Sequence, residues 1–313
     1  MTIEARGLTK RYGDKTAVDE LTFTVRAGTV TGFLGPNGAG KSTTMRLILG
    51  LDRATAGTVT VAGRPYAAHR APLREVGALL EARSVHGGRS AYKHLLGLAL
   101  TQGISRGRVD EVIEAVGLAG VAKKRVGGFS LGMGQRLGIA AALLGDPATV
   151  ILDEPVNGLD PEGVLWIRNL LKSLAAEGRT VFVSSHLMSE MALTAEQLII
   201  IGRGRLLADT TVEEFVRSAG RDEISLRSPE TGRLREAIAG PGVTITADAP
   251  DTLRVSGLDA EAIGLAAAAH GIPVFELTPH RVSLEDAFME LTRDAVEHHA
   301  APVPNEQEQE VAA

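Results

Sequence analysis

The stretch GPNGAGKSTT combines glycines, a lysine and hydroxyl side chains at a spacing that suits the binding of a phosphate chain. Glycine permits backbone conformations and close approach that a Cβ would prevent, so successive N–H groups can converge on phosphate oxygens where a helix begins. In such a loop Lys41 bridges the β- and γ-phosphates and the Ser42 hydroxyl ligates Mg²⁺. The predicted phosphate-binding residues are Gly35, Pro36, Asn37, Gly38, Ala39, Gly40, Lys41, Ser42 and Thr43.

Two carboxylates, Asp153 and Glu154, stand at the end of the apolar run VILDEP. Ligands of open α/β sheets bind at the carboxyl ends of the strands, where these side chains are expected. There Asp153 suits Mg²⁺, directly or through water, and Glu154 suits orienting or deprotonating the water that attacks a γ-phosphate. A pair of strand-end carboxylates that only caps a turn is the alternative. Together with the phosphate loop, the pair predicts hydrolysis of a nucleoside triphosphate.

The elements that must position these residues form an α/β pattern. Short apolar strands alternate with helical segments through about residue 220, which predicts a core with a parallel sheet, and residues 85–145 predict a helical insertion. Residues 197–209 are predicted to form one strand. Strand and helix signals over 221–293 follow the order βαββαβ, which predicts a small ferredoxin-like α+β domain ending in a helix. Residues 294–313 lack apolar periodicity and are predicted to be disordered.

Composition narrows the class of protein. The chain has 313 residues, a formal net charge of −5 and no cysteine, which excludes disulfides and thiolate sites and gives no electrostatic support for a nucleic-acid partner. No apolar run reaches the roughly 18–20 residues that cross a bilayer. We therefore expect a cytoplasmic protein whose membrane role, if it has one, comes through a partner.

Three further segments stand in a fixed order around the carboxylates: FSLGMGQR before them, VNGLDPEG directly after them, and SSH at the end of the next strand. A serine followed by glycine at the start of a long apolar helix exposes N–H groups and a hydroxyl to an anion, although a well-capped core helix has the same start. In this order and spacing, residues 3–220 resemble the ATP-binding subunits of ABC transporters. The resemblance implies a P-loop NTPase cassette with a mixed-sheet core, a helical insertion, and ATP and Mg²⁺ as cofactors.

The resemblance also assigns roles by position. Ser130, Gly132 and Gln135 match the signature motif, usually LSGGQxQR, which in the family contacts the γ-phosphate held by the opposite subunit of a head-to-tail dimer. Asp160 matches the aspartate that couples the two sites, and His186 matches the switch histidine that reaches the γ-phosphate. Tyr12 matches the aromatic residue that stacks on adenine, although a surface tyrosine in a hairpin would give the same short match.

Two departures point to a subfamily. Glu81 stands where the family usually has glutamine, and Leu131 and Met133 replace a glycine and a glutamine of the signature motif. An acid at position 81 could still approach Mg²⁺ or water, with altered local electrostatics. These changes, with the LEDAF segment at Leu284–Phe288, resemble the bacitracin- and daunorubicin-type exporters of antibiotics and lipid-like molecules.

The resemblance implies two partners: a second ATPase subunit, expected to be identical, and an integral membrane permease encoded separately. The protein would then lie on the inner face of the cell membrane. Two other functions remain open at this stage: a soluble ABC ATPase acting on ribosomes or nucleic acid, and a non-catalytic regulatory module. The first usually carries two cassettes or a long coiled-coil insertion, and neither is visible in the sequence.

Overall fold

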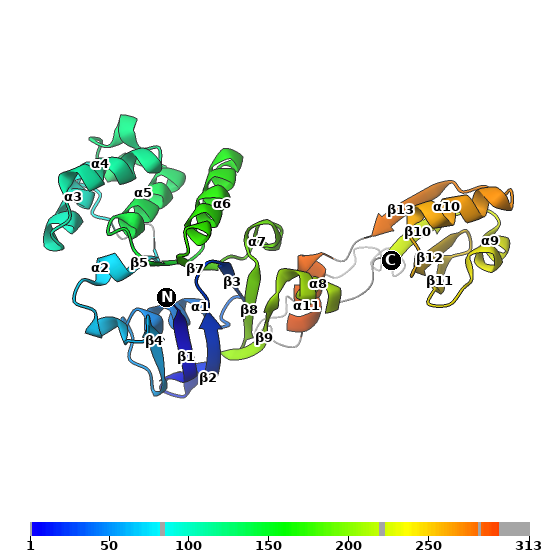
Figure 1. Cartoon of the computed structure of the whole chain (residues 1–313), viewed down its shortest axis with the longest axis horizontal. Coiled ribbons are helices and arrows are strands. Elements are labelled where there is room, and N and C mark those ends of the chain that lie inside the picture. Colours follow the sequence, from blue (N-terminus) through cyan, green and yellow to red (C-terminus); the bar gives the residue numbers. More distant parts are fainter. Residues whose placement is uncertain (1, 82–84, 219–222, 281–282, 294–313) are drawn as a thin grey trace, which may run out of the picture. The chain divides into compact units, whose positions relative to one another are not determined.

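The computed structural model describes residues 2–81, 85–218, 223–280 and 283–293 (Figure 1). The predicted disordered tail, 294–313, lies outside the described residues. Contacts divide the described residues into two compact units, the first within residues 1–186 and 199–209 together with 292–293, and the second within 187–198 and 210–291.

The first unit contains a six-stranded sheet of order β5-β6-β7-β3-β8-β9. The pairs β5/β6, β6/β7 and β3/β7 are parallel, as the alternation of strands and helices predicted. Its strands are β3 (Val30–Leu34), β5 (Val76–Leu79), β6 (Thr149–Leu152), β7 (Thr180–Ser184), β8 (Gln197–Gly202) and β9 (Arg205–Thr211). The prediction of one strand over 197–209 was wrong, because Arg203 and Gly204 turn the chain with φ values of 48° and 81°.

A second, antiparallel sheet of order β2-β1-β4 covers the region around helix α1 (Lys41–Ile48). Its strands are β1 (Ile3–Tyr12), β2 (Lys15–Val25) and β4 (Ala56–Val61). Three buried rings, Phe23, Phe33 and Phe182, join this sheet to the parallel one, with ring centroids 4.9–6.0 Å apart. This apolar contact between the sheets fixes the strand that leads into the phosphate loop.

The predicted helical insertion is confirmed between β5 and β6 (Figure 1). Serines cap its helices: Ser90, Ser105 and Ser130 each accept a hydrogen bond from the N–H three residues on. The insertion consists of α3 (Ala91–Thr101), α4 (Arg106–Ala115) and α5 (Leu131–Leu143). The short helix α2 (Pro72–Glu75) precedes β5, and α6 (Pro161–Ala176) follows β6.

The second unit begins with α7 (Met188–Thr194) and α8 (Val212–Ser218) and contains a four-stranded antiparallel sheet of order β11-β12-β10-β13. Its elements follow the predicted βαββαβ order: β10 (Glu223–Arg227), α9 (Thr231–Ile238), β11 (Thr244–Ala249), β12 (Thr252–Ser256), α10 (Ala260–Ala269) and β13 (Glu276–His280), with α11 (Leu284–Thr292) after them. Alternate residues of β10 and β12, such as Leu226 and Val255, form an apolar core of their own. Among the described residues, no helix is both long and apolar enough to cross a membrane.

Candidate active site

The phosphate loop lies between β3 and α1. Backbone hydrogen bonds connect it to segments that are distant in the sequence. The N–H of Gly204 donates to the carbonyl of Ala39 at 2.9 Å, and the N–H of Asp19 donates to the carbonyl of Gly204 at 2.9 Å. Gly40 has φ of 104°, and a Cβ at this position would lie 2.4 Å from the carbonyl oxygen of Ala17. The loop conformation therefore requires glycine at position 40, for its dihedral angle and for its closeness to β2.

All of the predicted loop residues except Gly35 line one pocket of about 470 Å³, which we call the loop pocket. The two carboxylates Asp153 and Glu154 lie on its wall, and so does Tyr12. The remaining lining residues are Lys15, Ala17, Pro36, Asn37, Gly38, Ala39, Gly40, Lys41, Ser42 and Thr43. Tertiary structure thus brings together the loop, the strand-end acids and the tyrosine, which lie far apart in the sequence.

Lys41 bends back over its own loop, where its Nζ donates to the carbonyl of Gly35 and, at 3.3 Å, to that of Pro36. Burial lowers the pKa of the Lys41 ammonium, while the carboxylates of Glu154 and Asp153 act in the opposite direction. A phosphate chain would offer this ammonium charged oxygens in place of carbonyls, which makes stronger hydrogen bonds.

Nucleotide binding is expected to weaken as the pH rises. The loss should begin at a lower pH than it would if Lys41 had the pKa of an ordinary lysine. The protonated Lys41 attracts phosphate, so affinity is full below its lowered pKa and falls as the pH rises through it. Binding of a fluorescent ATP analogue between about pH 7 and about pH 10 measures this change. In Lys41→Arg the guanidinium stays protonated, so the alkaline loss should disappear; an equal loss in both proteins would contradict the role of Lys41.

Ser42 and Asp153 form the pair of oxygen ligands that the sequence predicted for Mg²⁺. The Ser42 hydroxyl donates to Asp153 Oδ2 at 2.7 Å, which places a hydroxyl and a carboxylate side by side at the loop pocket. Hard oxygen donors of this kind fit Mg²⁺, which usually takes one or two protein ligands and completes its shell with water and phosphate. Among the described residues no group of three or more His, Cys, Asp or Glu side chains could hold a metal ion.

Glu154 and His186 face one another at the carboxyl ends of β6 and β7. Glu154 Oε2 lies 2.6 Å from His186 Nδ1 and also accepts the backbone N–H of His186 at 3.2 Å. The Glu154 side chain, which lines the loop pocket, is 23% exposed, and that of His186, which is not among the lining residues, is 56% exposed. A carboxylate in this position can accept a proton from water, and the imidazole can hold its orientation.

Tyr12 contributes an exposed ring at the edge of the loop pocket. The ring is 48% exposed; its hydroxyl donates to Asp52 Oδ2 at 3.0 Å, and Lys10 Nζ lies 4.7 Å from the ring centroid. Arg46 also pairs with Asp52, at 2.7 Å, so the hydroxyl end of the ring is anchored, and Lys10 lies over one of the two ring faces. An anchored aromatic face beside a phosphate site suits the stacking of a base.

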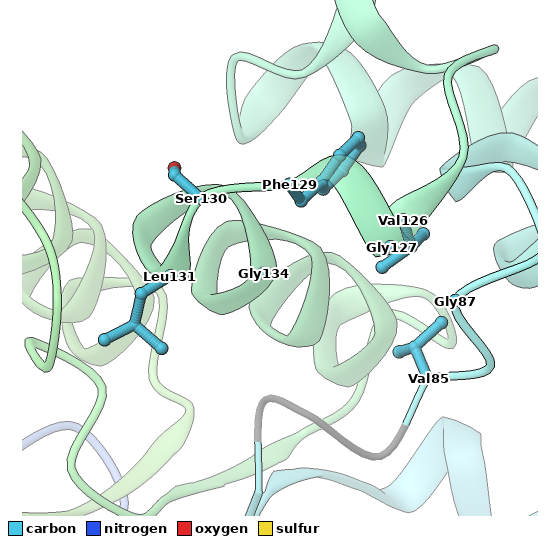
Figure 2. A pocket seen from close by; sticks show the side chains of 8 residues that line it. All are labelled: Val85, Gly87, Val126, Gly127, Phe129, Ser130, Leu131 and Gly134. Carbon is cyan, nitrogen blue, oxygen red and sulfur yellow. The ribbon is translucent and has the colours of Figure 1, made fainter.

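Two of the signature residues, Ser130 and Gly132, do not line the loop pocket. Ser130 caps α5, and its Oγ accepts from the N–H of Met133 at 3.2 Å. Figure 2 shows Ser130 and Leu131 at the start of α5, beside a separate pocket of about 310 Å³ that we call the signature pocket. Its other lining residues are Val85, Gly87, Val126, Gly127, Phe129 and Gly134. One chain therefore carries the loop pocket and the exposed signature helix as two distinct surfaces.

Gly132 and Asp160 also make contacts within their own chain. A Cβ at Gly132 would lie 2.7 Å from the carbonyl oxygen of Gly158, so the first turn of α5 rests directly on the loop that follows Glu154. Asp160 caps α6, with Oδ1 accepting from the N–H of Gly163 at 2.9 Å. Gln135 is 4% exposed and its amide donates to the carbonyl of Glu154 at 3.0 Å.

Glu81 lines a third pocket, of about 360 Å³, which lies between the core and the helical insertion and which we call the core–insertion pocket. It does not belong to the lining of the loop pocket. Apolar side chains dominate the wall of the core–insertion pocket, including Leu49, Leu51, Tyr66, Leu73, Val76, Leu79, Leu80 and Val85. In this structure the acid predicted to approach Mg²⁺ borders an apolar recess instead.

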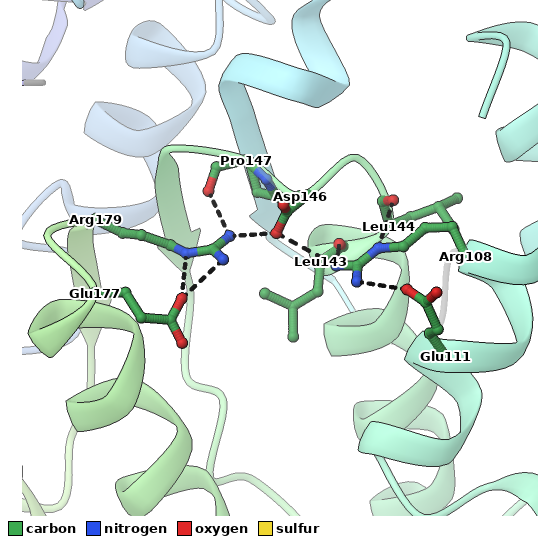
Figure 3. A network of polar contacts seen from close by, with 8 residues as sticks. All are labelled: Arg108, Glu111, Leu143, Leu144, Asp146, Pro147, Glu177 and Arg179. Carbon is green, nitrogen blue, oxygen red and sulfur yellow. Dashed lines mark hydrogen bonds and ion pairs between the residues drawn. The ribbon is translucent and has the colours of Figure 1, made fainter. Parts of the chain in front are cut away.

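The far end of α5 is held by a polar network that joins insertion and core (Figure 3). Arg108 of α4 donates to the carbonyls of Leu143 and Leu144 and lies 3.5 Å from Asp146. Arg179, from the turn before β7, pairs with the same Asp146 at 2.8 Å and also donates to the carbonyl of Pro147 at 3.0 Å. The C-terminal end of α5 is therefore anchored to both parts of the first unit.

Sequence reasoning did not identify Ser184 as a site residue. Ser184 is fully buried at the end of β7; its Oγ accepts the N–H of Glu154 at 2.9 Å and donates to Asp153 Oδ1. The pair of serines directly before His186 was a usable signal, because polar residues are unusual at the end of a buried strand.

Comparisons with known proteins identify the class to which this site belongs. A family model described as ABC transporter matches residues 18–157, and one described only as a domain of unknown function matches 222–285. A bacitracin transport ATP-binding protein of Bacillus licheniformis is 45% identical over 210 residues, which cover 66% of this chain and 69% of that protein. A daunorubicin resistance ATP-binding protein of Streptomyces coeruleorubidus is 35% identical over 309 residues, 93% of this chain and 96% of that protein.

Solved structures show the same fold over about two thirds of the chain. An ATP-binding subunit of an ABC transporter superposes with a TM-score of 0.64 at 25% identity, covering 70% of this chain and 93% of the other. A dimeric ATP-binding cassette in a post-hydrolysis state, bound to ADP and phosphate, gives a TM-score of 0.61 at 24% identity, covering 67% of this chain and 98% of the other.

Proposed function

The chain belongs to the ATP-binding proteins of ABC transporters, as an ATPase subunit of the exporter type, and from this premise we propose how its residues bind and hydrolyse ATP and what it exports. The phosphate chain lies on the loop of residues 35–43 with Lys41 against the β- and γ-phosphates, and the adenine stacks on Tyr12. Ser42 and Asp153 would hold Mg²⁺, which would supply positive charge to neutralise and orient the phosphate oxygens. Glu154, oriented by His186, accepts a proton from the attacking water.

One observation carries this proposal: the loop pocket and the signature pocket share no lining residue. The loop pocket has a cation, a hydroxyl and two acids on its walls, but the signature residues Ser130 and Gly132 lie outside it. A second copy in head-to-tail orientation would bring its Ser130 and the N-terminus of its α5 to the open side of the loop pocket. Two ATP molecules would then lie between two chains, each held by the loop of one and the signature helix of the other.

The core–insertion pocket is our candidate for the contact with the membrane subunit. Its wall is mostly apolar, and Leu51 on that wall is 56% exposed. An exposed apolar surface of this kind is typical of a site that binds another protein. Glu81 and Arg46 at the same pocket supply opposite charges that would orient a docked helix. Glu81 lies two residues beyond β5, and β5 pairs with β6, the strand that ends directly before Asp153. Docking here would therefore reach the carboxylates through these two strands.

We further propose that the permease is a separate polypeptide, that the subunit lies on the cytoplasmic face of the membrane, and that the transported molecule is an antibiotic or lipid-like compound. The relatives named for bacitracin transport and daunorubicin resistance support this substrate class. We retain the boundaries of 1–220 for the cassette and 221–293 for the accessory domain as a proposal. For the accessory domain we propose a structural role, since the outward residues of its sheet pair with one another, as Arg254 does with Glu223 and Asp248.

Co-expression with a membrane protein encoded beside this chain tests the transport role. The wild-type chain should co-purify with that protein and make cells resist the exported compound. Leu51→Glu, which places a charge in the core–insertion pocket, should weaken co-purification at least about tenfold while ATP binding is retained. Leu206→Glu, at an exposed leucine of β9, is the matched control and should co-purify normally. Co-sedimentation with ribosomes in place of the membrane protein would overturn the transport proposal.

A further inference from the structure

The backbone of Glu154 adopts an unfavourable conformation at the centre of the site. Its φ is 52°, in the left-handed region, where a residue with a Cβ loses about 1–2 kcal/mol relative to the usual conformations. Such a conformation persists only where the surroundings hold it, and it determines where the carboxylate points. The groups that hold the backbone of Glu154 therefore determine the direction of its carboxylate, which we propose accepts a proton from the attacking water.

Two buried side chains hold both polar groups of this residue. The N–H of Glu154 donates to Ser184 Oγ at 2.9 Å, and its carbonyl accepts from Gln135 Nε2 at 3.0 Å. Ser184 is fully buried and Gln135 is 4% exposed, so water cannot readily replace either partner. We call Gln135, Glu154 and Ser184 the backbone clamp. One arm of the clamp comes from β7 of the core and the other from α5 of the helical insertion.

The arm from α5 has a mechanical consequence. The C-terminal end of α5 is anchored by Arg108 and by the Asp146–Arg179 pair (Figure 3). Its N-terminal end carries Ser130 on an exposed surface, and Gln135 lies five residues further along the same helix. The first turn also rests on the loop after Glu154 through the close approach of Gly132 to the carbonyl of Gly158. A displacement of this turn would therefore reach Glu154 through Gln135 and through that loop.

We propose that Gln135 is a positioning residue that acts within its own chain: it transmits the engagement of the signature helix to the Glu154 carboxylate of the same subunit. The inference rests on the proposed dimer with two ATP molecules. In that dimer the nucleotide on the partner's loop contacts this chain's α5, and Gln135 connects α5 to the glutamate that serves this chain's own nucleotide. The two ATP sites are thereby coupled through one buried amide.

Replacing Gln135 in the homodimer tests the positioning role. Gln135→Leu keeps the size of the side chain but leaves the Glu154 carbonyl without its donor, so kcat should fall about 10- to 100-fold while KM for ATP changes less than about threefold. Gln135→Glu can donate to that carbonyl only when its carboxyl is protonated, so its rate relative to wild type should rise as the pH falls. Gln102→Leu, elsewhere in the insertion, is the control and should keep the wild-type rate. Normal kcat in Gln135→Leu would overturn the inference.

A pair of mixed dimers distinguishes action within the chain from action on the partner's nucleotide. Each is compared, in single-turnover reactions, with a reference dimer of one wild-type and one Glu154→Gln chain. In the first dimer Gln135→Leu and Glu154→Gln are on different chains, so the remaining glutamate has a broken clamp and hydrolysis should be lost. In the second dimer both changes are on the same chain, so the intact chain should hydrolyse ATP at the reference rate.

Normal hydrolysis in the first dimer and loss in the second would show that Gln135 acts on the partner's nucleotide. Equal rates in both dimers would show that Gln135 acts on neither nucleotide. Either result would overturn the inference. ATP binding and thermal unfolding of Gln135→Leu, compared with wild type, separate loss of positioning from loss of folding. If Gln135→Leu unfolds, the pH dependence of Gln135→Glu and the mixed dimers that carry Gln135→Glu take its place. A wild-type chain that fails to hydrolyse ATP would overturn the proposed function itself, whereas the mixed-dimer results bear only on Gln135.

Discussion

Replacing Glu154 with glutamine is expected to leave ATP binding intact and to lower turnover by at least about 100-fold, the usual contribution of a positioned general base. The amide keeps the size of the side chain and can still hydrogen-bond to His186, which now lies 2.6 Å from the carboxylate, but it cannot accept a proton from water. Because ATP would bind without being cleaved, the two chains should remain associated around it.

Two measurements check this expectation together. Phosphate release should be nearly absent in Glu154→Gln, and size-exclusion chromatography with ATP should show a dimer that wild type forms only transiently. The control is Glu162→Gln, which makes the same change at an exposed glutamate in the first turn of α6 and should behave as wild type. Near-normal phosphate release from Glu154→Gln would remove Glu154 from the role proposed for it.

Adding a single methyl group at Gly40 is expected to abolish nucleotide binding. An alanine Cβ there would lie 2.4 Å from the carbonyl oxygen of Ala17, and the residue would have to keep φ of 104°. The backbone must therefore shift, and the N–H groups that converge on the phosphates shift with it. We expect the Kd for ATP to rise at least about 100-fold, because several convergent hydrogen bonds are lost at once.

Gly28 provides a matched control for that substitution. Its φ of 81° is also left-handed, but no atom lies within 4 Å of the Cβ that would be added. Gly28→Ala should therefore lose only about 1 kcal/mol of stability and keep its affinity for ATP. Isothermal titration with ATP and thermal unfolding of both variants separate the two effects. Equal affinities for ATP in Gly40→Ala and Gly28→Ala would contradict the requirement for glycine at position 40.

The local parts of the site follow directly from the sequence. The position of the loop GPNGAGKSTT and its role could be predicted from a short stretch of sequence. The glycines that allow the turn and the residues that begin α1 are adjacent in the chain. The order βαββαβ of the second unit and the helical insertion were likewise predicted, since the spacing of apolar residues that marks a strand or a helix is a local property of the sequence. The start of α6 is a local signal of the same kind, because Asp160 and Pro161 are a recognisable cap and first residue of a helix.

Residue types and spacing were sufficient to nominate Lys41, Ser42, Asp153 and Glu154, because a phosphate loop and strand-end carboxylates must meet at one edge of a parallel sheet. His186 was nominated only through the resemblance to the family. Contacts between distant segments decided the rest. Gln135 and Ser184 hold the backbone of Glu154 from two different elements, and Glu81 borders an apolar recess apart from the loop pocket. Such contacts depend on how helices and strands pack in three dimensions. They therefore cannot be predicted from the spacing of residues along the chain.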